Sequence, residues 1–174
     1  MNAGHAARPA GTATGEPVAP AAAPIPSTPT TGIRRVLIAL DETAVAARAM
    51  DVGAQIAAAV GAEVALVYVV DPNLLVAADG GPAPDVMRAE YEREARSLLE
   101  SAAGHLRTAT PPWQFLEAGQ PAREIVRVAG SWAADLIVVG THGRSRIGRT
   151  FLGSTAHGVL EHAHRPVLIV PAAG

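Results

Sequence analysis

Five short, mainly apolar runs constrain the fold of this chain more than any other feature. The runs are Val36–Leu40, Val64–Val70, Trp113–Glu117, Leu136–Gly140 and Val167–Val170. Apolar runs of about four to eight residues are typical of strands that a sheet buries on both faces. We therefore predict five strands at the centre of the fold.

Stretches with helical spacing separate these runs, at Ala44–Val60, Asp85–Leu106, Pro121–Trp132 and Ser154–His162. Asp41 and Thr43 supply a carboxylate and a hydroxyl where the first helix should begin, and Gly61 should end it. Strands that alternate with helices predict an α/β fold with one five-stranded parallel sheet, and right-handed crossovers place helices on both faces. Ligands of such sheets bind beyond the carboxyl ends of the strands, where the strand order reverses.

Residues 1–32 differ in composition from the rest of the chain, with six prolines and only two charged residues, Arg8 and Glu16. Such a segment buries too little apolar surface to offset the entropy of ordering it. We predict a disordered alanine- and proline-rich tail at 1–32 and a single domain at 33–174. Prolines interrupt the apolar segment that a signal peptide would need, and no run reaches the about 18 apolar residues of a membrane span. We therefore expect a cytoplasmic protein that does not bind membranes.

All 14 basic residues are arginine, and the chain contains neither lysine nor cysteine. Disulfide scaffolds, thiol catalysis, lysine Schiff bases and a standard Walker A lysine are therefore excluded. The net charge of −2 provides no basic surface for nucleic acid, and the 3% of aromatic residues are too few for a base-stacking platform. We therefore expect no nucleic-acid partner.

The loop after the fourth apolar run, Gly140–Thr155, contains the clearest candidate chemistry. Its glycines allow the backbone to approach a phosphate closely. Residues 153–155 (Gly-Ser-Thr) open a helix, so backbone N–H groups and two hydroxyl groups gather at one point. Arg144, Arg146 and Arg149 add guanidinium donors for phosphate oxygens. The alternative interpretation is a solvated, glycine-rich surface loop.

A Walker A motif is the nearest competing interpretation of this loop. Residues 143–150 match that motif except that Arg149 occupies the place of the lysine. Arginine does not replace the compact lysine ammonium between two phosphates. The predicted helix also begins at Ser154 and not at Arg149, so the P-loop interpretation is disfavoured.

The loop also shows a spacing of Gly, two residues, Gly, nine residues and Gly-Ser, at Gly140, Gly143, Gly153 and Ser154. This spacing resembles the ATP-binding signature of the universal stress protein family. The resemblance extends from Ile33 to Pro171. Further segments that are similar to the family pattern are Ala39–Asp41, Gly119–Ala122, Ala134–Gly140 and Arg165–Val170.

The resemblance implies a Rossmann-like fold of the adenine nucleotide alpha hydrolase type, with strand order 3-2-1-4-5. It implies an ATP site between the first and fourth strands, with Mg²⁺ accompanying the nucleotide. On the adenine and ribose side it implies Ala39, Asp41, Val69, Val139 and Gly140. For the phosphates it implies Gly143, Gly153, Ser154 and Thr155, next to Arg144. Thr43 stands where the family usually has serine. Threonine keeps the hydroxyl group but crowds the turn.

The candidate site offers phosphate donors but no clear general base, nucleophile or pair of metal-binding carboxylates. We therefore expect a nucleotide-responsive stress or regulatory module and not a turnover enzyme. A slow ATPase, or an interaction module that binds cyclic AMP or no nucleotide, stays open as an alternative. The closing strand Val167–Val170 would leave an exposed edge, and the resemblance implies that two such edges meet in a homodimer. His157 and His162 are five residues apart and do not form a helical metal site.

Overall fold

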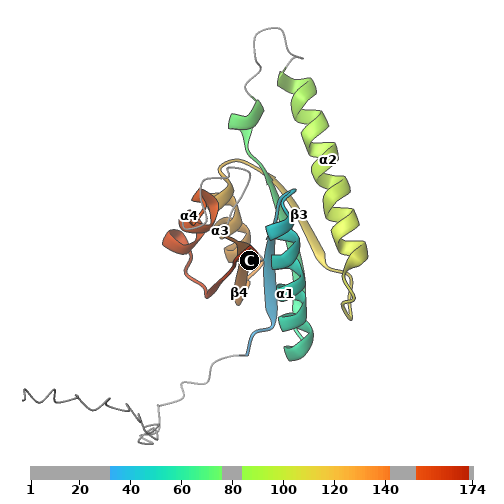
Figure 1. Cartoon of the computed structure of the whole chain (residues 1–174), viewed down its shortest axis with the longest axis vertical. Helices are drawn as coiled ribbons and strands as arrows, with labels where there is room; N and C mark the ends of the chain where they lie inside the picture. The colour runs from blue at the N-terminus through green and yellow to red at the C-terminus, as the bar shows by residue number, and fades with distance from the viewer. Residues whose placement is uncertain (1–31, 76–83, 142–151, 173–174) are drawn as a thin grey trace, which may run out of the picture. The chain divides into compact units, whose positions relative to one another are not determined.

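A computed structural model describes residues 32–75, 84–141 and 152–172, which contain one parallel sheet in the order β3-β2-β1-β4-β5 (Figure 1). The fold class and the strand order predicted above are confirmed. The strands are β1 Arg35–Leu40, β2 Glu63–Val70, β3 Trp113–Ala118, β4 Leu136–Gly140 and β5 Val167–Val170. The helices are α1 Ala44–Val60, the short 3-10 helix η1 Pro72–Leu75, α2 Pro84–His105, α3 Pro121–Ser131 and α4 Ser154–His162. The predicted tail lies outside the described residues except for Gly32.

Helices cover both faces of the sheet, α1 and α2 on one face and α3 and α4 on the other (Figure 1). Alternate residues of each strand divide between the two layers. In β1, Val36 and Ile38 pack beneath α1 and α2, whereas Leu37 packs beneath α3 and α4. All three side chains are fully buried, so the central strand contributes to both apolar layers at once. Among the described residues, no helix is long and apolar enough to cross a membrane.

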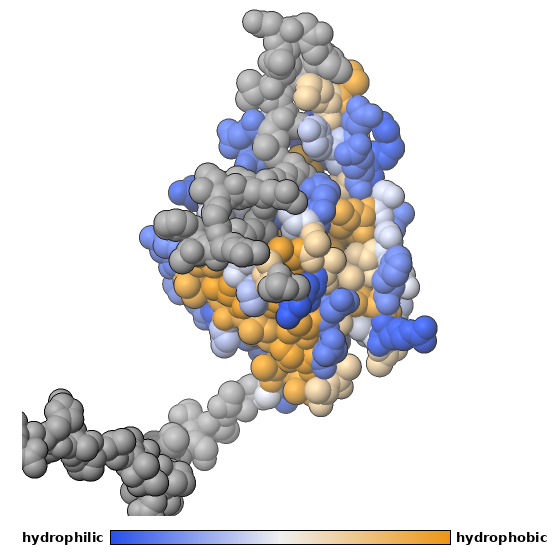
Figure 2. Space-filling model, viewed as in Figure 1, coloured by the Kyte–Doolittle hydropathy of each residue, from blue (hydrophilic) through white to orange (hydrophobic). Residues whose placement is uncertain are grey.

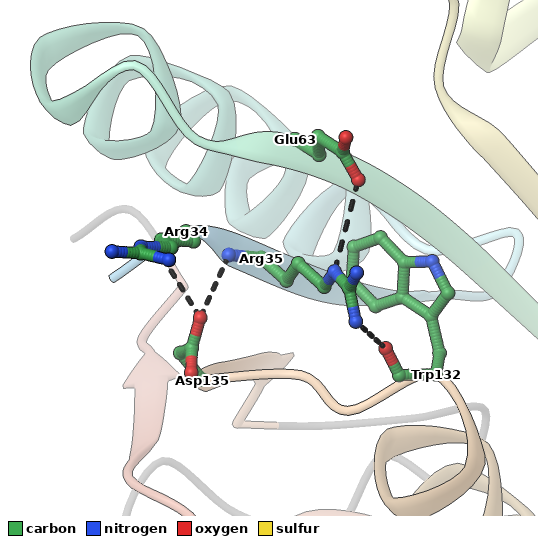
Figure 3. A network of polar contacts seen from close by, with 5 residues as sticks. All are labelled: Arg34, Arg35, Glu63, Trp132 and Asp135. Atoms are coloured by element: carbon green, nitrogen blue, oxygen red, sulfur yellow. Dashed lines mark hydrogen bonds and ion pairs between the residues drawn. The ribbon is translucent and has the colours of Figure 1, made fainter. Parts of the chain in front are cut away.

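A polar network joins the first residues of β1 to the start of β4 (Figure 3). Asp135 Oδ2 accepts hydrogen bonds from the backbone N–H groups of Arg34 and Arg35 at 2.8 and 3.0 Å. The Arg35 guanidinium lies over the ring of Trp132, donates to its carbonyl oxygen at 3.0 Å and pairs with Glu63 of β2. This network holds three neighbouring strands together at their amino ends.

Arg127 links α3 to the edge strand β3. Its guanidinium pairs with Glu124 at 2.7 Å on the same helix and with Glu117 of β3 at 2.5 Å. The pKa of Arg127 is raised above its ordinary value, chiefly by the hydrogen bond to Glu124 and also by the charge of Glu117, against the opposing effect of desolvation. The two ion pairs therefore join α3 to the neighbouring edge strand at the surface of the protein.

Helices α3 and α4 approach each other closely at a glycine. A Cβ atom at Gly158 of α4 would lie 2.7 Å from the Cβ of Ala122 in α3. The alanine Cβ is attached directly to the backbone, so it can move away only if the helix moves. Gly158 is therefore required by the packing of the two helices.

We predict that Gly158→Ala lowers the free energy of unfolding by about 1–3 kcal/mol, because the added methyl group must separate two packed helices. Gly130→Ala is the matched control, since a Cβ there would meet nothing within 4 Å. The control should raise the free energy of unfolding by about 0.5–1 kcal/mol, because alanine has less backbone entropy to lose. Urea unfolding followed by circular dichroism measures both. A Gly158→Ala protein as stable as the wild type would contradict this packing.

Candidate functional site

Three of the predicted adenine-side residues lie together on one face of the sheet. Ala39 of β1, Val69 of β2 and Val139 of β4 all belong to the apolar layer on the α3 and α4 side. They lie near the carboxyl ends of three neighbouring strands. Ala39 and Val69 are only partly buried, whereas Val139 is buried. The sheet therefore presents an apolar floor near the place where the strand order reverses.

Gly140, the first glycine of the loop spacing, has a packing role that the sequence did not reveal. A Cβ atom at this position would lie 2.9 Å from Cγ1 of Val45 and 3.4 Å from the Val45 backbone, at the start of α1. The absence of a side chain allows the first turn of α1 to lie against the end of β4. Gly140 is thus explained by packing whether or not a ligand binds.

Gly153, the last glycine of the loop spacing, lies beside the end of β4. The backbone N–H of Gly153 donates a hydrogen bond of 2.7 Å to the carbonyl oxygen of Thr141, and the N–H of Thr141 donates to Val170 of β5 at 2.9 Å. Gly153 has φ −61° and ψ 155°, a conformation open to any amino acid. Gly153 is therefore not required by its own backbone conformation.

Helix α4 begins next to this bond, with Gly153 as its N-cap residue and Ser154 and Thr155 in its first turn. The N-cap makes no side-chain hydrogen bond to the helix. The first N–H groups of a helix have no intrahelical acceptor, and the helix dipole adds partial positive charge there. The start of α4 is therefore suited to a negatively charged group close to the end of β4.

Asp41 and Thr43 form the turn between β1 and α1. Oδ1 of Asp41 accepts hydrogen bonds from both the backbone N–H, at 2.9 Å, and the hydroxyl of Thr43. The Thr43 oxygen in turn accepts from the N–H of Ala46 at 3.2 Å and caps α1. Threonine thus performs the cap with extended backbone angles, φ −88° and ψ 149°. Asp41 has a structural role in this turn in addition to the ligand role predicted for it.

Glu42 and Tyr68 form a contact that sequence reasoning missed, since nothing marked Glu42 as more than a solvent-exposed neighbour of Asp41. The hydroxyl of Tyr68, a buried residue of β2, donates a hydrogen bond to Oε1 of Glu42. This contact lies on the α1 and α2 side, because Tyr68 belongs to that apolar layer. The sequence signal that points to this contact is the hydroxyl group of Tyr68, the single one in the otherwise apolar part of β2.

Two of the predicted phosphate-side residues, Gly143 and Arg144, lie outside the described residues, as do Arg146 and Arg149. The side chains of His157 and His162 make contacts within α4. His157 lies 4.0 Å from Glu161, and Nδ1 of His162 lies 2.7 Å from the carbonyl oxygen of Gly158. No three histidine, aspartate or glutamate side chains come together as metal ligands within the part of the chain that the structure describes.

Comparison with known proteins assigns the family. The sequence model of the universal stress protein family matches residues 32–171. The chain belongs to this family. One relative is the universal stress protein MJ0531 of Methanocaldococcus jannaschii, 32% identical over 143 residues that cover 79% of this chain and 81% of that protein.

Solved structures of the family share the fold. A universal stress family protein from Burkholderia pseudomallei is 30% identical with a TM-score of 0.66, over 83% of this chain and 100% of that one. A universal stress protein solved in complex with cAMP is 28% identical with a TM-score of 0.62, over 79% of this chain and 97% of that one. The family and its Rossmann-like architecture, both expected from the sequence, are confirmed.

We predict that Thr43→Val lowers the free energy of unfolding by about 1 kcal/mol, because valine keeps the shape but loses the hydroxyl that caps α1. Thr43→Ser is the matched control and should stay within about 0.5 kcal/mol of the wild type, since serine is an equally good cap. Thermal and urea unfolding measure the difference. Equal stability of the valine and serine proteins would show that the Asp41–Thr43 turn does not hold the helix.

Proposed function

We propose that this protein binds ATP at the carboxyl end of the sheet, between β1 and β4, and acts as a nucleotide-responsive stress or regulatory module. The adenine would lie on the floor made by Ala39, Val69 and Val139. Asp41 would face the ribose. The phosphates would lie at the start of α4.

The observation that carries the proposal is the hydrogen bond between Gly153 and Thr141. It joins the start of α4, which has no side-chain cap, to the end of β4, on the side of the sheet that bears the apolar floor. An apolar surface next to backbone N–H donors matches the two halves of an adenine nucleotide. The cAMP complex of a relative supports the same class of ligand.

The remaining predicted residues complete this proposal. Gly140 would let the nucleotide lie close to the end of β4. Ser154 and Thr155 would donate hydroxyl groups to the phosphates, and Gly143 and Arg144 would contribute from the adjoining loop. Mg²⁺ would accompany ATP as its counterion, since phosphate oxygens and water are the ligands that Mg²⁺ prefers.

Cyclic AMP is the second candidate ligand, because the structure of one relative contains it. Both nucleotides would use the apolar floor, but cyclic AMP carries a single phosphate and would make fewer contacts with the start of α4. The proposal therefore ranks ATP above cyclic AMP. We propose no turnover role, because the described site residues include no general base paired with a nucleophile.

We predict that nucleotide released from the purified, denatured protein is ATP, identified by mass spectrometry. In calorimetry, Gly153→Val should weaken ATP binding by at least about tenfold, because a branched side chain would stand where the phosphates approach the helix N-terminus. The backbone angles of Gly153 accept valine, so the fold should survive with a modest loss of capping. Gly130→Ala, on the surface of α3, is the control and should bind ATP as the wild type does.

If the protein bound cyclic AMP but not ATP, the proposed ligand would be wrong and the proposed site would still stand. Retained ATP affinity in Gly153→Val would refute the placement of the phosphates. An absence of binding by either nucleotide at millimolar concentration would refute the proposed function.

We also propose that two copies of the chain meet along β5. Within the part of the chain that the structure describes, β5 is an edge strand that pairs with β4, and three of its four side chains are partly exposed. Figure 2 shows apolar side chains gathered on this side of the molecule, near the end of the chain. An apolar edge strand with free backbone groups favours pairing with another strand.

We predict that the chain sediments at twice its mass of 17.8 kDa and that Val167→Lys, on β5, shifts it to the monomer. A lysine on an edge strand opposes strand pairing. Val60→Lys is the matched control, because Val60 is 52% exposed at the end of α1, away from β5. A wild-type monomer in sedimentation equilibrium, or a dimer that survives Val167→Lys, would contradict this interface.

A further inference from the structure

Asp41 occupies the first position after β1, two residues beyond Ala39 of the proposed adenine floor. Neighbouring residues of an extended chain lie about 3.3 Å apart, so Asp41 is only about 7 Å along the chain from that floor. Its side chain is partly buried at the carboxyl end of the sheet. A ribose attached to an adenine on the floor would therefore come close to the Asp41 carboxylate.

The two carboxylate oxygens of Asp41 have different surroundings. Oδ1 accepts a hydrogen bond of 2.9 Å from the backbone N–H of Thr43 and another from the Thr43 hydroxyl. Within the part of the chain that the structure describes, Oδ2 accepts no hydrogen bond. A carboxylate that is held through one oxygen keeps the other in a defined position. Oδ2 is therefore the oxygen that Asp41 can offer to a ligand.

The Thr43 hydroxyl is used as both acceptor and donor. Its oxygen accepts from the N–H of Ala46 at 3.2 Å, which caps α1, and its proton goes to Asp41. A hydroxyl has one proton to donate, so the bond to Asp41 fixes the orientation of the O–H group. The branched β carbon of threonine also restricts χ1. The cap of α1 and the orientation of Asp41 therefore depend on the same hydroxyl group.

The residue between Asp41 and Thr43 is held from β2. Tyr68 is 3% exposed, and its hydroxyl donates a hydrogen bond to Oε1 of Glu42. The turn is thus anchored to the sheet as well as to the start of α1. A ligand that meets a side chain already fixed in place pays less conformational entropy than one that must order it.

We infer that Thr43 is a positioning residue for the sugar of the nucleotide. Its N–H and hydroxyl hold Oδ1 of Asp41, and Oδ2 then accepts from the ribose hydroxyl groups. This role rests on the proposed function, because it lies within the same site. The Thr43 hydroxyl consequently contributes to affinity only for ligands that carry ribose hydroxyl groups.

The test measures, by calorimetry, the affinity of the full chain for ATP and for 2′,3′-dideoxy-ATP, which lacks both ribose hydroxyl groups. The wild type should bind ATP at least about fivefold more tightly, because the dideoxy sugar cannot donate to the charged acceptor. Thr43→Val keeps the backbone bond to Oδ1 but loses the hydroxyl. It should weaken ATP by about threefold to fivefold and change the affinity for dideoxy-ATP by less than about twofold. Thr43→Ser restores the hydroxyl and should bind both ligands as the wild type does.

Gly61→Ala is the matched structural control. Gly61 ends α1 with φ 69° and ψ 31°, and a Cβ there would meet nothing within 4 Å. Alanine is strained in this left-handed conformation, so the substitution weakens the opposite end of the same helix without touching Asp41. It should leave the preference for ATP over dideoxy-ATP at its wild-type value.

Unchanged ATP affinity in Thr43→Val, or an equal loss of affinity for both ligands, would reduce Thr43 to a helix cap and overturn the positioning role. A Thr43→Ser protein as weak as Thr43→Val, or a lost preference in Gly61→Ala, would overturn it too. If the wild type bound both ligands equally, the positioning role would be wrong and the nucleotide site would stand. If it bound neither ligand, the proposed function would fail and the positioning role with it.

Discussion

The pairing of β1 on both of its edges is the constraint on which the rest of this structure depends. Residues Arg35–Leu40 pair with β2 along their whole length, and Val36–Ile38 pair with β4 on the other side. The chain runs from β1 to β2 on one side and later returns to β4 on the other, so the strand order reverses at β1. Such a reversal opens a crevice at the carboxyl ends of the strands. Asp135 joins the amino ends of β1 and β4, at the opposite end of these strands from the crevice.

The two glycines at the ends of the loop spacing have different physical origins. Gly140 has no side chain because the start of α1 occupies the space that a Cβ would need. Gly153 adopts a conformation that any residue can take, so backbone geometry does not explain it. A ligand close to the start of α4 would explain the second glycine but is not needed for the first. The glycine spacing of this chain therefore combines a packing requirement with a proposed binding requirement.

The turn from Asp41 to Thr43 combines a structural role with a proposed ligand role. It caps α1 through Thr43, and Asp41, which accepts from Thr43, would face the proposed ribose position. Its three side chains are held from different directions, since Glu42 is bound by a tyrosine of β2 and Asp41 by Thr43. Substitution of Asp41 would therefore change stability and binding together, which makes Gly153 a better probe of the proposed nucleotide site.

The sequence by itself determined the strands and helices, whose bounds were predicted to within one residue, because apolar runs, helical spacing and capping residues are local properties. It also predicts a nucleotide site at the carboxyl ends of the strands, which stays a prediction, while the strand order came from the family resemblance. The short helix η1 lies between β2 and α2, in a segment for which we predicted neither a strand nor a helix. Only the tertiary structure decided which residues from distant parts of the chain meet, such as Val45 against Gly140 and Tyr68 with Glu42. These contacts join residues far apart in the chain, so they depend on how the layers pack and have no local pattern.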